Sequence, residues 1–335
     1  MIPSLADVLA ARRAIAGIAV RAPLVSSGHM SRIAGCEVLY KLEMTQPVGA
    51  FKLRGAVNAV AALGADVAGV TCCSTGNHGR ALAFAARAKG LRAVVCMSSL
   101  VPQAKVEGIR ALGAEVRIVG RSQDEAGAES RRLALEDGLV EIPPFDDPLV
   151  VAGQGTIGLE MLEDRPDLAA ILVPLSGGGL AAGVALAAKA VNPAIKVVGV
   201  TMDRGAAMRD SIRAGRPVEV EEVASLADSL GGGIGLDNRL TFALCRDLLD
   251  DCILVTEDEI HDAMQTLYFE DRMVAEGAAV VGIAAIKSGR LPRSGGPVAT
   301  ILTGRNVDMA AFTDIVSGRG ATLGAIELKG RAYGA

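Results

Sequence analysis

The 335-residue chain is half hydrophobic and 3% aromatic, and its net charge of −4 includes no basic run, so nucleic acid is not an expected partner. No apolar stretch reaches about 18 residues and Met1–Ser4 do not open a signal peptide, so we expect no membrane span and a cytoplasmic location. The six cysteines are scattered without a Cys-x-x-Cys pair, which is typical of reduced thiols.

The first predicted elements form an alternating block of short apolar strands and Ala-rich helices. In chain order we expect strand 69–73, helix 80–89, strand 92–97, helix 103–112, strand 115–119 and helix 123–136. Alternation of this kind, with strands that are apolar throughout, favours an α/β fold in which helices cover both faces of a parallel sheet.

A second set of elements follows the turn-rich segment Pro143–Pro148, where the chain is expected to cross between two lobes. It comprises predicted strands at 170–174, 196–200 and 298–302, and predicted helices at 181–190, 257–269 and 278–287. After about residue 318 no core pattern is visible. We therefore predict a large domain of residues 1–68 and 146–320, a small mobile domain of residues 69–145, and a C-terminal tail of residues 321–335.

Lys52 lies in the segment Gly49–Ala56, which is apolar, bounded by glycine and expected to open a helix. A buried amine without a carboxylate partner has a lowered pKa, and its neutral form is a nucleophile. Lysines of this kind form Schiff bases with carbonyl compounds. Taken alone, however, an isolated lysine is more often a surface residue at a helix start, so the other motifs must decide.

A first turn rich in small polar residues, Ser74–Gly79, stands between a predicted strand and a predicted helix. Free backbone N–H groups at such a helix N-terminus can hold an anion, for instance a substrate carboxylate. An ordinary N-capped turn explains the same residues.

A second turn, Ser176–Leu180, places three consecutive glycines after a strand and before a helix, which is typical of a phosphate site. It also resembles a dinucleotide fingerprint built from Gly177, Gly179 and Gly183, with Asp203 at the end of the next strand. On this motif alone, a nicotinamide-dependent oxidoreductase remains open.

Two further observations concern carboxylates and histidines. Glu276 stands before a predicted helix, where a carboxylate is favoured by the helix dipole whatever its function. His29, His78 and His261 show no metal-ligand spacing. Neither observation defines a site by itself.

Taken together, these motifs resemble the fold-type II enzymes that depend on pyridoxal 5′-phosphate (PLP), and within them the threonine dehydratase and serine racemase group. The similarity runs from about residue 15 to 310, with order and spacing kept, and it is carried by Gly49–Ala56, Ser74–Gly79, Phe145–Pro148, Ala152–Thr156, Ser176–Leu180 and Leu302–Asp308. It leaves the nicotinamide-dependent oxidoreductase as a minor alternative, because that hypothesis does not explain Lys52 or the turn containing Asn77.

The resemblance implies a role for each site residue. Lys52 would carry PLP as an internal aldimine and act as base and acid at the substrate Cα, and Thr75 would be a second catalytic residue. Asn77 would bond the pyridoxal 3-oxygen, and Thr303 would face the ring nitrogen. The residues expected to hold the cofactor are Phe51, Lys52, Asn77, Gly177, Gly178, Gly179, Leu180, Glu276 and Thr303. Those expected to bind the substrate are Ser74, Thr75, Gly76, His78 and Arg305.

The chain departs from the group at four places. Thr75 replaces the serine that serves racemases as a base, which disfavours racemisation. Ser176 replaces the first of four loop glycines, and Arg305 replaces a glycine near the cofactor mouth, where it could bind a substrate anion. The divalent-cation site of the group would fall on side chains that offer no acid, so we predict no metal at Thr201, Gly205 and Ala207.

The segment Ser225–Gly235 contains the triple glycine Gly231–Gly233 and resembles the dehydratases of hydroxyectoine utilisation. We therefore predict a homodimeric PLP-dependent dehydratase or ammonia-lyase that acts on a β-hydroxy-α-amino acid. Hydroxyectoine, or a hydroxy-diaminobutyrate derived from it, is the favoured substrate, while threonine, serine and 3-hydroxyaspartate stay open. The alternatives are a serine or threonine racemase, a β-replacement synthase, and a PLP-binding protein without turnover.

Overall fold

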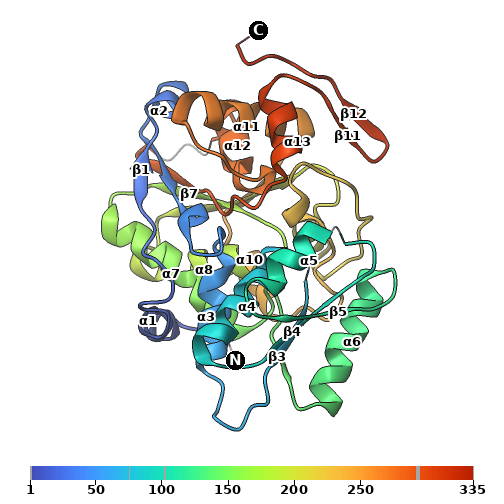
Figure 1. Cartoon of the computed structure of the whole chain (residues 1–335). Coiled ribbons are helices and arrows are strands. Elements are labelled where there is room, and N and C mark those ends of the chain that lie inside the picture. The colour runs from blue at the N-terminus through green and yellow to red at the C-terminus, as the bar shows by residue number, and fades with distance from the viewer. Residues whose placement is uncertain (1, 75, 102, 292–294, 335) are drawn as a thin grey trace.

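Two sheets organise the chain, and Figure 1 shows them in different halves of the molecule. The computed structural model describes residues 2–74, 76–101, 103–291 and 295–334. The larger sheet has the strand order β1 (Leu24–Ser26), β2 (Val38–Lys41), β10 (Val298–Ile301), β7 (Ala170–Pro174), β8 (Lys196–Met202) and β9 (Asp251–Val255). The smaller sheet has the order β5 (Glu115–Ile118), β4 (Ala93–Met97), β3 (Val70–Cys73) and β6 (Val140–Glu141).

The pairing in these sheets is parallel at every described pair except β1 with β2, which is antiparallel. The α/β fold with parallel sheets is thus confirmed. Predicted and observed elements differ by a few residues at their ends. For example, β8 continues to Met202. The helix predicted from residue 278 begins later, because a 3-10 turn, η3 (Gly277–Ala279), occupies its predicted start.

The larger sheet is covered on both faces because side chains alternate along each strand. Tyr40 and Leu172 pack against one set of helices, while Leu39 and Ile171 pack against the other. The first set is α2 (Gly28–Ala34), α11 (Glu257–Asp271), α12 (Val281–Lys287) and α13 (Met309–Val316). The second set is α7 (Pro148–Asp164), α8 (Gly179–Val191), α9 (Ala207–Ala214) and α10 (Leu240–Leu248), and α1 (Leu5–Ala14) packs outside α7 and α8.

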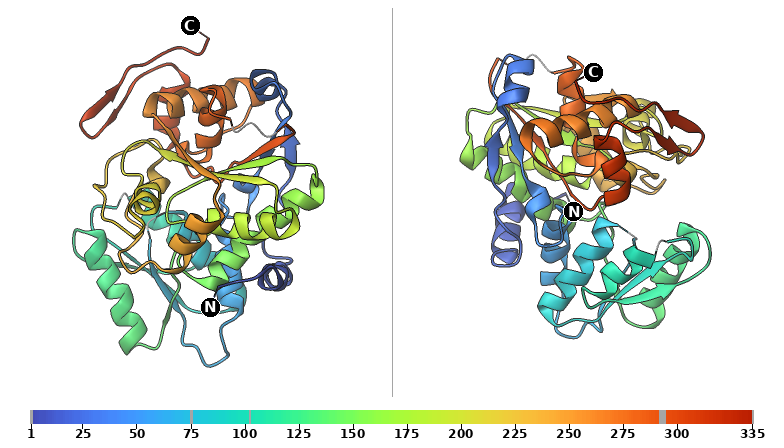
Figure 2. Two further views of the ribbon diagram at one scale, coloured as in Figure 1. Left: turned by 180° about the vertical axis from the view of Figure 1, so that it is seen from behind. Right: turned by 45° about the horizontal axis from the view of Figure 1, so that its top comes forward.

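The smaller sheet forms the second lobe, which Figure 2 shows in cyan and green beside the rest of the chain. Its helices are α3 (Lys52–Ala61), α4 (Asn77–Lys89), α5 (Gln103–Arg110) and α6 (Gln123–Glu136). Leu53 and Val57 of α3 share one core with Val70 and Leu82, so this core extends to residues that precede position 69. The domain limits and the mobility of the small domain stay predictions.

A buried cluster of ions fixes the start of α3 against the larger lobe. Arg54, fully buried, donates to Glu43 at 2.8 Å and to Glu160 of α7 at 2.7 Å. Lys41 donates to Glu160 at 2.7 Å and to the Ala22 carbonyl oxygen at 2.6 Å. Burial alone would lower the pKa of Arg54, but the charges and hydrogen bonds of the two glutamates outweigh it and raise this pKa.

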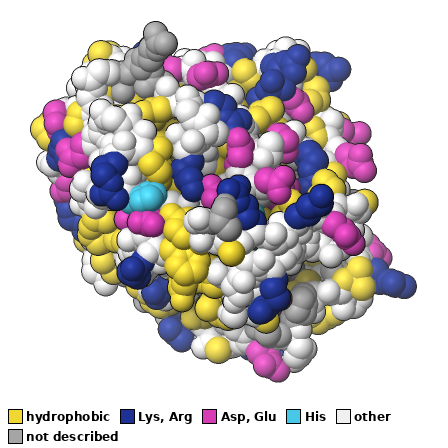
Figure 3. Space-filling model, turned by 90° about the horizontal axis from the view of Figure 1, so that it is seen from above, with side chains coloured by type: hydrophobic (Ala, Val, Ile, Leu, Met, Phe, Trp, Pro, Cys, Tyr) yellow, Lys and Arg dark blue, Asp and Glu magenta, His cyan; other side chains and the backbone are white. Residues whose placement is uncertain are grey.

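The C-terminal residues contain a hairpin, β11 (Ala321–Leu323) with β12 (Ile326–Leu328), where the sequence shows no core pattern. Beyond it, Tyr333 stacks on Phe269 of α11 with ring centroids 5.0 Å apart. The surface in Figure 3 mixes Lys and Arg with Asp and Glu without a large patch of one sign. Within the described ranges, no helix is both long and apolar enough to cross a membrane.

Candidate active site

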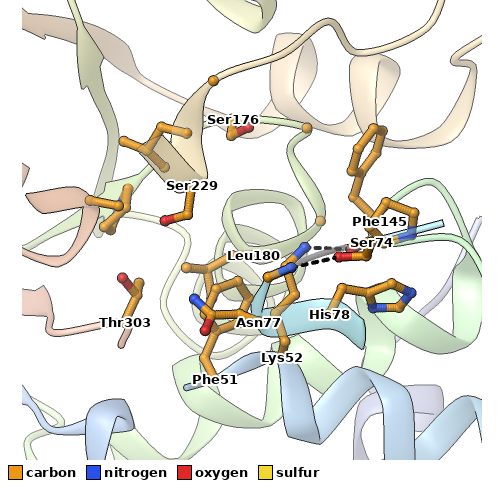
Figure 4. Close-up of a pocket in the computed structure, with 18 of the residues that line it drawn as sticks. Phe51, Lys52, Ser74, Asn77, His78, Phe145, Ser176, Leu180, Ser229 and Thr303 are labelled. Carbon is orange, nitrogen blue, oxygen red and sulfur yellow. Dashed lines mark hydrogen bonds between the residues drawn. The ribbon is translucent and has the colours of Figure 1, made fainter. Parts of the chain in front are cut away.

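A pocket of about 320 Å³ lies where the two lobes meet, and it gathers most of the predicted site residues (Figure 4). Among its lining residues are Phe51, Lys52, Ser74, Gly76, Asn77, His78, Gly177, Gly178, Gly179, Leu180, Glu276 and Thr303. They come from the starts of α3, α4 and α8 and from the segments around η3 and after β10. Residues far apart in the sequence thus meet at the N-termini of three helices.

Lys52 stands in the first turn of α3, and its amine points to a neutral partner. Its Nζ donates to the Pro144 carbonyl oxygen at 2.6 Å and lies 5.5 Å from the centroid of the Phe51 ring. Burial lowers the pKa of Lys52 to about 8. At pH 7 about a tenth of this amine is therefore unprotonated and able to attack a carbonyl carbon, far more than for an ordinary lysine.

The glycine loop precedes α8 and has no room for side chains. A Cβ on Gly177 would strike the Phe145 ring, and a Cβ on Gly178 would lie 2.7 Å from Met208 Cε. Gly178 also has a φ of +88°, which favours glycine. The bare loop leaves the first N–H groups of α8 accessible, which suits a phosphate group.

Two aspartates next to this loop have structural roles. Asp146 accepts hydrogen bonds from the backbone N–H groups of Leu240 and Thr241 at the start of α10, at 3.1 and 2.8 Å. Asp147 caps α7 and accepts from Leu149 at 2.8 Å. Asp146 therefore ties the crossing segment to α10, whose Thr241 also donates to the Gly177 carbonyl oxygen at 2.8 Å.

The start of α4 forms the opposite wall. Its N-cap residue, Gly76, offers no side-chain cap, so the first N–H groups of α4 are available to an anion. His78 Nε2 lies 2.8 Å from the Ile142 carbonyl oxygen, and because a carbonyl only accepts, Nε2 carries the hydrogen. Burial, together with the charge of Lys52, lowers the pKa of His78 to about 3, so this histidine stays neutral.

Glu276 is buried beside Asn77, and burial raises its pKa to about 7. The side-chain Nδ2 of Asn77 donates to Glu276 Oε1 at 2.9 Å, and Asn306 Nδ2 donates to Asn77 Oδ1 at 2.6 Å. Ser229 reaches Glu276 Oε1 at 3.5 Å. This carboxyl group therefore contacts the residue expected to bond the cofactor and is more than a helix-start carboxylate.

These residues fit PLP by their chemistry. The bare glycine loop can hold a phosphate, the Lys52 amine can form a Schiff base with an aldehyde, and the buried hydroxyl group of Thr303 lies in the same pocket. Phe51 supplies an apolar ring, and its N–H donates to the Thr303 carbonyl oxygen at 2.9 Å. The pocket thus has a suitable group for each part of the cofactor.

One predicted site residue is not part of this arrangement, and the place of a second is not described. Arg305 is exposed and does not line the pocket. Thr75 lies outside the described residues, so its predicted catalytic role stays a prediction. No group of three or more His, Cys, Asp or Glu able to hold a metal occurs in the described parts of the chain. The absence of a metal at Thr201, Gly205 and Ala207 also stays a prediction.

Other lining residues were given no role of their own from the sequence. Lys105 of α5 and Asp228 of the 3-10 turn η2 (Asp228–Leu230) are both exposed and bring one charge of each sign to the pocket lining. Phe145 packs against the glycine loop. For Phe145 the segment Phe145–Pro148 gave a signal, whereas Lys105 stands in an ordinary helical pattern that gave none.

The comparisons with known proteins agree with this geometry. Residues 15–304 match the family described as pyridoxal-phosphate dependent enzyme. A protein of Sinorhizobium fredii with the provisional name threonine dehydratase is 53% identical over 94% of this chain and 96% of its own length. The L-threonine ammonia-lyase of Thermotoga maritima is 38% identical over 94% of this chain and 78% of its own length.

Solved structures give the same result. Maize serine racemase superposes with a TM-score of 0.89 at 33% identity, covering 94% of this chain and 97% of the racemase. Threonine deaminase isoform 2 of Solanum lycopersicum, in its processed form, superposes with a TM-score of 0.87 at 35% identity, covering 93% and 91%. The prediction of a PLP enzyme of fold type II is therefore confirmed, and the chain belongs to the pyridoxal-phosphate dependent enzyme family, among relatives of the threonine dehydratase and ammonia-lyase group.

Proposed function

We propose that this enzyme eliminates water from a β-hydroxy-α-amino acid and releases a 2-oxo acid and ammonia. The observation that carries the proposal is the Lys52 amine, which has a pKa lowered to about 8, bonds the neutral Pro144 carbonyl oxygen and lines a pocket shared with the bare glycine loop. The relatives named threonine ammonia-lyase and threonine deaminase support the same reaction class.

The chain's own residues supply three actions. The first N–H groups of α4, after Gly76, bind and orient the substrate carboxylate. The Lys52 Nζ takes the proton from Cα. His78 does not compete for this proton, because its lowered pKa makes it a much weaker base than the lysine. PLP, when linked to the substrate amine in place of Lys52, would withdraw electrons from Cα and so make this proton acidic. Departure of the β-hydroxyl group as water, followed by hydrolysis, gives the 2-oxo acid and ammonia.

The substrate is proposed from the lining and the resemblance together. Gly231 and Asp228 line the pocket, so the glycine segment that resembles the hydroxyectoine-utilisation dehydratases lies at this site. We favour a hydroxy-diaminobutyrate derived from hydroxyectoine, or hydroxyectoine itself, with threonine and serine as second candidates. Because Arg305 is outside the pocket, the argument for a second anionic group, as in 3-hydroxyaspartate, loses its support.

The test is an ammonia and 2-oxo acid assay on the full-length chain loaded with PLP. Threonine, serine, 3-hydroxyaspartate, hydroxyectoine and 3-hydroxy-2,4-diaminobutyrate are compared by kcat/KM. Lys52→Ala should abolish ammonia release, while the exposed Lys196→Ala serves as the matched control. Absence of ammonia from every compound, despite a bound and Lys52-dependent chromophore, would overturn the lyase proposal.

Racemisation is the second candidate, favoured by the similarity to maize serine racemase. Chiral chromatography of serine after incubation separates the two reactions, because a racemase yields D-serine without stoichiometric ammonia. A homodimer and a cytoplasmic location are further parts of the proposal. Sedimentation velocity tests the first, and cell fractionation tests the second.

A further inference from the structure

Asn77 is held at both ends of its side-chain amide by residues from the other lobe. Asn306 Nδ2 donates to Asn77 Oδ1 at 2.6 Å. Asn77 Nδ2 donates to Glu276 Oε1 at 2.9 Å and to Oε2 at 3.2 Å. Asn77 begins α4 of the smaller lobe, whereas both partners belong to segments that flank the larger sheet. The amide therefore bridges the lobes.

The direction of this chain of hydrogen bonds is set by a backbone carbonyl. Asn306 Nδ2 also donates to the Val48 carbonyl oxygen at 2.9 Å. A carbonyl can only accept, so Asn306 must present its NH2 group on this side. The same NH2 group meets Asn77, and it requires an acceptor there. Asn77 must therefore turn its oxygen toward Asn306.

At the other end, Glu276 selects the nitrogen of Asn77. Above its pKa of about 7 the Glu276 carboxylate only accepts, so it faces an N–H group, as the contacts from Asn77 Nδ2 to both of its oxygens show. Its two oxygens are close together, whereas the two N–H bonds of an amide diverge, so one N–H serves the carboxylate and the second remains. Figure 4 shows Asn77 in the pocket together with Lys52 and Phe51. The remaining N–H is the group available to a ligand.

The backbone around both partners is shaped to admit them. Gly49 has a φ of +76°, and a Cβ there would lie 2.8 Å from Asn306 Oδ1. A Cβ on Gly304 would strike the Glu276 carboxyl group. A side chain at either glycine would displace one end of the arrangement.

We propose that Asn306 and Glu276 are positioning residues that fix the polarity of the Asn77 amide and so aim its second N–H at the 3-oxygen of the pyridoxal ring. The inference rests on the proposed function, in which this oxygen lies beside Asn77. In the reversed amide, Oδ1 would face the ring oxygen, and two acceptors would repel each other.

Two ligands that cannot bond to Lys52 isolate this contact. Pyridoxine 5′-phosphate carries the 3-oxygen, 3-deoxypyridoxine 5′-phosphate lacks it, and neither has an aldehyde. Isothermal titration of both into the cofactor-free full-length chain gives their affinity ratio. Asn306→Asp cannot donate to Asn77, so it favours the reversed amide. We expect it to lower the affinity for pyridoxine 5′-phosphate about tenfold and to leave the affinity for the deoxy ligand nearly unchanged.

Three variants complete the test. Asn306→Ala removes the donor without adding charge and should give a smaller loss in the same direction. Arg305→Gln lowers the net charge by the same one unit at a neighbouring exposed residue, and it should leave the affinity ratio unchanged. Asn77→Ala should abolish the preference for the 3-oxygen.

The outcomes separate this inference from the function on which it rests. If Asn77→Ala keeps the preference, the ring oxygen is not beside Asn77, and the proposed placement of the cofactor fails. If Asn77→Ala abolishes the preference but Asn306→Asp and Asn306→Ala keep it, the cofactor is placed as proposed and the positioning role of Asn306 is overturned.

Discussion

Lys52 and Arg54 are two cations, two residues apart on one helix, with opposite surroundings. Arg54 bonds Glu43 and Glu160, which keep it charged. Lys52 bonds the neutral Pro144 carbonyl oxygen, and burial lowers its pKa to about 8. The partner, rather than burial itself, therefore decides whether a buried cation serves structure or chemistry.

Replacing Lys52 should abolish the chemistry of the uncompensated cation and give the largest effect. Lys52→Ala removes both the point of cofactor attachment and the base at Cα, so we expect kcat/KM to fall by at least about 10⁴-fold. The melting temperature of the cofactor-free protein should not fall, because the amine that is removed has no carboxylate partner in its bond to the Pro144 carbonyl oxygen. Steady-state kinetics and calorimetry measure the two quantities. Activity within a factor of about 100 of the wild type would contradict the assigned role.

Replacing Arg54 should break the structural side. Arg54→Met leaves Lys41 paired with Glu160 but removes the cation that pairs with buried Glu43, so we expect the free energy of unfolding to fall by about 3–5 kcal/mol. Arg132→Met is the control, since Arg132 pairs with Glu129 and Glu136 at the surface, where such pairs contribute about 1 kcal/mol or less. Urea denaturation measures the free energy of unfolding of both variants. Equal losses would show that the buried Arg54 cluster stabilises the protein no more than a surface ion pair does.

The lowered pKa of Lys52 sharpens the comparison without any mutation. In the cofactor-free protein, the rate of Lys52 labelling by an amine reagent should reach its midpoint near pH 8. For an ordinary exposed lysine this midpoint lies at about pH 10.4. The folded pKa lies below the unfolded value, so the unfolded chain binds more protons between pH 8 and 10.5, and stability should rise over this interval. Pulse labelling with mass spectrometry gives the midpoint, and a value near 10.4 would contradict the buried, unpaired state.

Glu276 extends the comparison to an anion and should give the smallest effect. Its folded pKa of about 7 exceeds the ordinary 4.5, so its stabilising contribution is complete below pH 4.5 and is lost as the pH rises to 7. Glu276→Gln should remove this loss and stabilise the protein at pH 8 by about 3 kcal/mol relative to pH 4.5. The measured quantity is the difference between variant and wild type across pH. An unchanged difference would mean that folding does not shift the pKa of Glu276.

Much of the fold could be predicted because its central strands are apolar throughout. The strand at 170–174 is found where the sequence places it. Helix α7, in contrast, was not predicted, since Gly153, Gly155 and Gly158 make it a poor helix by propensity. These glycines allow close packing instead: a Cβ on Gly153 would lie 2.6 Å from the Gly55 Cα. Propensity cannot reveal a contact with a helix about a hundred residues away.

The site shows the same division between motifs and long-range contacts. Lys52, Asn77 and Gly177 stand in recognisable motifs and meet in one pocket. The pairing of Arg54 with Glu160 spans 106 residues, and nothing local signals it. Arg305 follows a motif but points to the surface, because its side-chain direction depends on the local backbone.

The order of strands in the larger sheet has a consequence for biosynthesis. Strand β2 precedes Lys52 in the chain, yet it lies between β1 and β10, and β10 consists of residues 298–301. During translation, β1 and β2 cannot pair with the rest of their sheet until nearly the whole polypeptide has been synthesised. A chain released before residue 298 therefore lacks the parallel partner of β2, and this strand edge stays exposed until residues 298–301 have left the ribosome.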